Sequence, residues 1–191
     1  KNRCKRASMQ LKGLCPEIES EKDNFYSYKK IDGQVLYNVL NSQIVNDFLD
    51  WAKLNLWKKV NLSKEEKDNF YLACQDFYYN KTIKRIKMFY DKTRITDGWN
   101  NINGLSVPPL KDLFNKIDWK GLYTGMPTNF HGDLQFDNVL VIRDKASNLQ
   151  KFVLLDWRQD FGNLTHLGDI YYDLAKMYGG VNISYQLIKE G

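Results

Sequence analysis

The stretch NFHGDLQFDNVLV, residues 129–141, sets the strongest constraint on how this chain can fold. It crowds a histidine, a glycine, two aspartates and an asparagine into eight positions and then runs directly into an apolar segment. A second apolar run, Phe152 to Leu155, follows the polar segment RDKASNLQK and leads straight into Asp156. Two apolar runs joined by a polar turn predict a β-hairpin. The polar residues before the first strand and after the second therefore lie at the same end of the hairpin.

Composition predicts a globular chain with one domain, or one domain and a piece of another. The 191 residues are 43% hydrophobic and 14% aromatic, which is enough to bury a sizeable core. The formal net charge of +5 is a mild excess that fits phosphate-bearing ligands, nucleic acid or solubility alone. Charge therefore does not decide between these classes of partner.

Cysteine usage and hydropathy predict a cytoplasmic protein without membrane attachment. The three cysteines are an odd number, show no CxxC spacing, and have only His131 and His166 as possible companions for a zinc site. We interpret them as reduced thiols. No apolar run approaches the roughly 20 residues that cross a bilayer, and the basic start lacks the apolar segment of a signal peptide.

The first half of the chain predicts one strand and two helices. Residues 1–24 carry little pattern and are expected to form a loop. Residues 25–31 alternate apolar and polar side chains and stop at an Asp-Gly pair, which predicts a strand and a turn. Apolar positions recur on one face of a helix over about 42–57, and a serine and a glutamate with capping-box spacing open a longer helix over about 63–90. We expect these two helices to pack antiparallel.

The second half predicts a loop over 97–104, a short helix over 108–117, the hairpin, and a closing helix over 170–178 that ends at Gly179 and Gly180. Together the elements predict an α+β fold that is mainly helical, with one small hairpin.

Three polar side chains at the base of the hairpin fit the chemistry of phosphoryl transfer. Asp133 follows His131 by two positions and precedes Asn138 by five, which fits the kinase pattern H-x-D-L-x-x-x-N, and Asp156 follows the second strand. The reaction needs a carboxylate that holds the acceptor hydroxyl and takes its proton. It also needs Mg²⁺, which prefers hard oxygen ligands such as carboxylate and amide oxygens. We therefore interpret Asp133, Asn138 and Asp156 as a catalytic set.

At these residues the sequence resembles the aminoglycoside phosphotransferase and choline kinase family, which has a protein-kinase-like fold. HGDLQFDN looks like the family's catalytic loop, LLDW is similar to its second metal-binding motif, and GDIYYDLA looks like the helix start after that motif. FYSYKKIDGQVL, residues 25–36, is a weaker match to the hinge between the two lobes. The two acidic motifs are specific when they occur together.

The resemblance implies a role for each matching residue. Asp133 would be the catalytic base, and Asn138 and Asp156 would be Mg²⁺ ligands. His131 would hold the catalytic loop, and Asp173 would accept hydrogen bonds from its backbone. The adenine of ATP, with GTP as an open alternative, would contact the backbone of the hinge at Tyr28, Lys29, Lys30 and Ile31.

The same resemblance implies a division of the chain. Residues 1–24 would be the tail of a missing N-terminal lobe, residues 25–36 the hinge, and residues 37–191 a protein-kinase-like C-terminal lobe that is truncated or partial. No G-x-G-x-x-G loop, Walker-type G-K-[ST] or V-A-I-K-like lysine occurs in the sequence.

Several residues have two interpretations. Trp157 fits either an acceptor pocket or the core, and Asp160 fits either a solvated acid or a contact with a cationic substrate. The aromatic residues of 70–90 fit helix packing better than a cation-binding box.

The expected activity is ATP- and Mg²⁺-dependent phosphorylation of a hydroxyl on a small molecule of the choline, ethanolamine, sugar or aminoglycoside kind. A non-catalytic pseudokinase is the alternative. Neither D-F-G nor A-P-E follows Asp156, which disfavours a protein substrate, and no recognised motif supports nucleic-acid binding by the basic residues 81–87.

Overall fold

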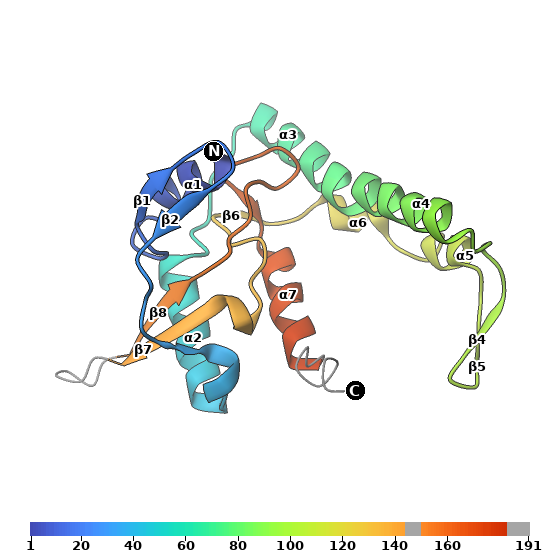
Figure 1. Ribbon diagram of the computed structural model, residues 1–191. Coiled ribbons are helices and arrows are strands. Elements are labelled where there is room, and N and C mark those ends of the chain that lie inside the picture. The colour runs from blue at the N-terminus through green and yellow to red at the C-terminus, as the bar shows by residue number, and fades with distance from the viewer. Residues whose placement is uncertain (144–149, 183–191) are drawn as a thin grey trace.

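A computed structural model describes residues 1–143 and 150–182, and shows an α+β chain with several small sheets beside long helices (Figure 1). The helices are α1 (Asn2–Met9), α2 (Ser42–Asn55), α3 (Lys64–Gln75), α4 (Lys81–Thr93), α5 (Leu110–Phe114), α6 (Trp119–Tyr123) and α7 (Ile170–Asn182). The strands are β1 (Ile18–Glu21), β2 (Tyr26–Tyr28), β3 (Gln34–Val35), β4 (Asn100–Ile102), β5 (Leu105–Val107), β6 (Pro127–Thr128), β7 (Val139–Arg143), β8 (Gln150–Leu154) and β9 (Gly168–Asp169). Short 3₁₀ turns cover Leu36–Val39 and Phe136–Asn138.

The predicted hairpin is confirmed and carries a third strand. β7 and β8 are antiparallel with Val139 opposite Leu154, and β3 pairs with the outer side of β7. The inward residues of the hairpin pack against α2 through an edge-to-face contact between Phe48 and Phe152, whose ring centroids lie 5.1 Å apart. The residues 144–149 of the expected turn lie outside the described part of the chain.

The first 24 residues differ from the predicted loop, because they contain α1 and β1. β1 pairs antiparallel with β2, which forms where the sequence predicts a strand. α1 turns Cys4, Arg6 and Ala7 inward. An arginine and a cysteine on the buried face do not produce an apolar stripe, so hydrophobic periodicity could not reveal this helix.

The helix starts are confirmed. Asn41 caps α2 by accepting a hydrogen bond from the Ile44 N–H, and Ser63 and Glu66 form the predicted capping box of α3. The long second helix is interrupted by a π-helical turn at Asp76–Asn80 before α4 continues it. The expected antiparallel packing is wrong: the buried residues of α2 and α3 belong to separate hydrophobic clusters, and the two helices lie apart (Figure 1).

α4, the β4–β5 hairpin and α5 form a distal arm, residues 81–114, that extends away from the hairpin sheet (Figure 1). The predicted loop at 97–104 contains β4, the predicted short helix over 108–117 forms as the shorter α5, and α6 was not predicted. α7 continues through Gly179 and Gly180 to Asn182, because neither glycine adopts the left-handed conformation that would end it. No helix in the two described ranges combines the length and the apolar content that a membrane span needs.

Candidate functional site

His131 joins the two predicted motifs. Its fully buried ring accepts a hydrogen bond from the Asp133 N–H at Nδ1, 3.1 Å away, and its Nε2 lies 2.8 Å from the Leu155 carbonyl oxygen. Because Nδ1 is the acceptor, Nε2 carries the proton that is donated to Leu155. Burial lowers the pKa of His131 to about 4, so the ring is neutral at pH 7. His131 therefore links the segment before Asp133 to the residue before Asp156.

Asp173 of α7 fixes the backbone of the loop that precedes β7. Its buried carboxylate accepts hydrogen bonds from the N–H groups of His131 and Gly132, at 2.8 and 2.7 Å, and from the Trp57 indole at 3.1 Å. Burial raises its pKa to about 6, and these hydrogen bonds oppose that rise. The Asp173 carboxylate therefore holds two successive backbone N–H groups of this loop.

Asn138 is connected to both candidate carboxylates through the backbone. Its Nδ2 donates to the Asp133 carbonyl oxygen at 2.8 Å, and its own carbonyl accepts from the Leu155 N–H at 2.8 Å. Because the amide nitrogen is directed at the loop, the amide oxygen is the atom that can face a cation. The structure therefore gathers Asp133, Asn138 and Asp156 at the base of the hairpin, and we call these residues with His131 and Asp173 the polar hub.

The two candidate carboxylates, Asp133 and Asp156, both form ion pairs. Asp133, about a third exposed, lies 2.8 Å from the Lys176 ammonium of α7, and Asp156 lies 2.6 Å from the Arg3 guanidinium of α1. Asp156 has φ 51°, a left-handed conformation that is uncommon outside glycine and that concentrates at functional sites. The partners Lys176 and Arg3 were not predicted from the sequence, because each comes from a distant helix.

Arg6 is a further supporting residue that sequence reasoning missed. Its guanidinium is fully buried, donates to the carbonyl oxygens of Phe130, His131 and Arg158, and lies 4.0 Å from the centre of the Phe130 ring. Burial lowers its pKa to about 10, and the group is still charged at pH 7. A lone arginine in a basic segment gives no sequence signal for such a position.

The predicted nucleotide-contacting residues lie beside a surface cleft. Tyr28 ends β2, and Lys29 and Ile31 line a cleft of about 470 Å³ opposite residues 16–19. Lys29 pairs with Glu19 at 3.7 Å, and Lys30 lies 4.0 Å from Asp32. Tyr26 of the same strand packs on Trp157 with ring centroids 6.1 Å apart, which places β2 next to the second motif.

Trp157 and Asp160 differ in exposure. Trp157 is fully buried and donates its indole N–H to the Arg3 carbonyl oxygen at 2.9 Å, which favours the core interpretation over contact with an acceptor. Asp160 is half-buried, and its charge acts on Arg6 and on Lys81.

The side-chain oxygens of the hub suit Mg²⁺ only if the substrate supplies further oxygen ligands. Within the described residues, no group of three or more His, Cys, Asp or Glu side chains is placed to hold a metal ion. Asn138 and Asp156 would supply one amide and one carboxylate oxygen. Mg²⁺ commonly accepts one or two protein ligands and completes its shell with phosphate oxygens and water.

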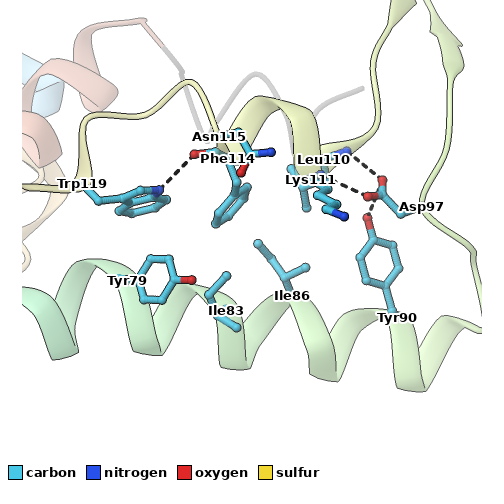
Figure 2. A pocket seen from close by; sticks show the side chains of 10 residues that line it. All are labelled: Tyr79, Ile83, Ile86, Tyr90, Asp97, Leu110, Lys111, Phe114, Asn115 and Trp119. Carbon is cyan, nitrogen blue, oxygen red and sulfur yellow. Dashed lines mark hydrogen bonds between the residues drawn. The ribbon is translucent and has the colours of Figure 1, made fainter.

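A separate apolar pocket of about 470 Å³ lies in the distal arm, between α4 and α5 (Figure 2). Ile83 and Ile86 of α4 face Phe114 of α5 across it. Asp97 accepts hydrogen bonds from Tyr90 and from the N–H groups of Leu110 and Lys111, so its carboxylate holds the start of α5. None of the hub residues lines this pocket.

Comparison of the chain with protein-family models, with curated proteins and with solved structures found no match.

Proposed function

We propose that this protein is an ATP- and Mg²⁺-dependent phosphotransferase that phosphorylates a hydroxyl group of a small molecule. The observation that supports it is the set of hydrogen bonds from His131 to Leu155, from Asn138 to Asp133, and from Leu155 to Asn138, which ties both motifs into one site. Phosphoryl transfer depends mainly on positioning and on electrostatic stabilisation, and such a rigid polar loop serves both.

Asp133 would orient the acceptor hydroxyl and take its proton as the hydroxyl oxygen bonds to the γ-phosphorus and the bond to ADP breaks. Asn138 and Asp156 would hold Mg²⁺, which when bound offsets charge on the phosphate oxygens. The Lys176 ammonium lies 2.8 Å from the Asp133 carboxylate and forms an ion pair with it. His131 and Asp173 would keep the loop in register without touching substrate.

The test measures ATP turnover in the presence of Mg²⁺ with a panel of amino alcohols, sugars, sugar phosphates and aminoglycosides. The wild-type protein is compared with the Asp133→Asn variant. We expect a loss of about 10²- to 10⁴-fold in kcat, the usual contribution of a general base. Asp137→Asn is the matched control, because Asp137 is exposed and lies on the same segment. Equal activity of Asp133→Asn and wild type would exclude the proposed role.

The ion pairs of the hub favour a second candidate, a non-catalytic module that binds nucleotide. Arg3 and Lys176 neutralise Asp156 and Asp133, and a lasting pairing would leave neither carboxylate for chemistry. This candidate requires nucleotide affinity that is the same with Mg²⁺ and with EDTA, and no turnover with any acceptor. The enzyme hypothesis requires instead that nucleotide binding depend on Mg²⁺.

A further inference from the structure

The segment after Asp156 is held against the π-helical turn between α3 and α4. The Phe161 ring stacks on Phe77 of that turn, with ring centroids 4.3 Å apart. Gly162, at φ 51°, comes so close to α3 that an added Cβ would lie 2.3 Å from the Ala73 carbonyl oxygen. π-helical turns inside α-helices occur frequently at functional sites. Here the turn directs Phe77 toward the segment that follows the second motif.

Arg158 places a guanidinium between this turn and the catalytic loop. Its N–H donates to the His131 carbonyl oxygen at 3.0 Å, and its Cβ would lie 2.5 Å from a Cβ added to Gly132. Arg158 therefore flanks the residue that precedes Asp133. Its guanidinium carbon lies 5.0 Å from the centre of the Phe77 ring, and the Lys81 ammonium lies 4.0 Å from the same ring. Two cations thus share one aromatic ring beside the proposed catalytic base.

The charges around these cations are unbalanced. The pKa of Lys81 is lowered to about 8, first by burial and then by the positive charges of Arg158 and Arg85, and Asp160 and Asp76 offset this only in part. The Arg158 Nε is buried and has no hydrogen-bond partner among the described residues. Cations gathered at this density repel one another, and an anion between them removes that cost.

We propose that Lys81 and Arg158 form a subsite for an anionic group, a phosphate or a carboxylate, carried by the acceptor. The inference rests on the proposed function and narrows its substrate class to acidic hydroxyl compounds, such as phosphorylated or carboxylated sugars. Cationic acceptors of the choline or aminoglycoside kind are disfavoured, since their ammonium groups would face two like charges. Arg158 provides planar donors for such an anion, and Lys81 provides a point charge.

The acceptor class is tested with a matched set: glucose 6-phosphate, glucuronate, glucose and glucosamine, each with ATP and Mg²⁺. We expect kcat/KM for the acidic sugars to exceed that for glucose by about 10- to 100-fold, the factor that one charged hydrogen bond supplies, and glucosamine to be poorest. A preference for glucose or glucosamine would overturn the subsite and leave the proposed function intact.

Substitution of Lys81 tests whether this residue causes the preference for acidic sugars. Lys81→Met should raise KM for the best acidic sugar by about 10-fold with an unchanged KM for ATP, and Lys81→Arg should restore most of the affinity. Lys87→Met is the matched control, because it removes the same charge from an exposed position of the same helix. A rise in KM for ATP alone would assign these cations to the nucleotide phosphates instead, which would also overturn the inference.

Binding without turnover separates the two proposals. Glucose 6-phosphate and inorganic phosphate are titrated into the protein by calorimetry in the absence of nucleotide. Binding of glucose 6-phosphate that Lys81→Met weakens and Lys87→Met does not would support the subsite even if no acceptor were turned over. Equal affinity of wild type and Lys81→Met for glucose 6-phosphate would refute it, whatever the catalytic result.

Discussion

The polar hub and the distal arm differ in how their side chains meet water. In the hub, the two supporting polar side chains are buried: His131 and Asp173 have no exposed surface, and each is held by several hydrogen bonds. In the arm, apolar side chains are exposed: Trp99 is 68% and Leu105 72% exposed, and α4 has no buried residue. Polar groups in a dry interior are costly unless paired, whereas exposed apolar groups cost little. The hub is therefore held by hydrogen bonds in a dry interior whereas the arm is exposed, and four experiments test this difference.

Asp173→Ala should have the largest effect. It leaves two loop N–H groups and the Trp57 indole without their acceptor, and a loss of about 3–5 kcal/mol in the free energy of unfolding is expected from removing a buried, hydrogen-bonded charge. Urea denaturation measures it. Asp137→Ala, in an exposed position, should change that free energy by less than about 0.5 kcal/mol. Similar effects of the two variants would remove the distinction on which the hub is defined.

Gly162→Ala should cost about 2–4 kcal/mol, because the new Cβ meets the α3 backbone and the residue has a positive φ. Gly98→Ala, within the arm, provides the contrast: nothing lies within 4 Å of an added Cβ, and the change should stay within about 0.5 kcal/mol of wild type. Thermal denaturation of both variants measures the difference. Equal stabilities would show that the loop is not held against α3.

Acidification should separate two opposing contributions. The pKa of His131 falls from 6.5 to about 4 on folding, so the unfolded chain takes up this proton first and stability is lost as pH falls through that range. The pKa of Asp173 rises from 3.8 to about 6, so the folded chain takes up this proton first and stability is gained as pH falls below 6. The Asp173→Asn variant lacks the gain of stability below pH 6 but keeps the loss that His131 causes. The stability gap between wild type and Asp173→Asn should therefore widen by about 2 kcal/mol between pH 7 and pH 4.5.

Urea denaturation at the two pH values measures that gap, with His131→Gln as the reverse case. Wild type loses stability through His131 on acidification and the variant does not, so the variant should become more acid-tolerant than wild type. A gap that stays constant with pH in both variants would contradict the opposing shifts.

Leu105→Ala should have the smallest effect, below about 0.5 kcal/mol, because the exposed side chain loses little contact on truncation. The arm is expected to exchange its amide hydrogens faster than the hub, as few buried contacts oppose its opening. A loss above about 1 kcal/mol would show that the arm packs more tightly than its exposure indicates.

Local patterns predicted the hairpin, the start of α2 near residue 42, the capping box at Ser63, and the start of α7, because each depends on residues a few positions apart. Contacts between residues that are far apart in the sequence were not predictable. Nothing near Arg6 indicates that its partners lie at Phe130 and Arg158, and amphipathic periodicity does not say which cluster a helix joins. The spacing of Asp133, Asn138 and Asp156 indicated a shared site through hairpin geometry, whereas the ion pairs of that site come from α1 and α7 and leave no trace in the motif itself.

The buried Arg6 also sets an order of events during synthesis. Its carbonyl partners on Phe130 and Arg158, and the Asp173 carboxylate that fixes the same loop, emerge from the ribosome long after α1. At bacterial-to-eukaryotic translation rates the wait from residue 6 to residue 173 is roughly 10 to 30 seconds. During that time the Arg6 guanidinium lacks the carbonyl oxygens that bind it in the folded chain. The loop around Asp133 therefore gains its full set of hydrogen bonds only after α7 has left the ribosome.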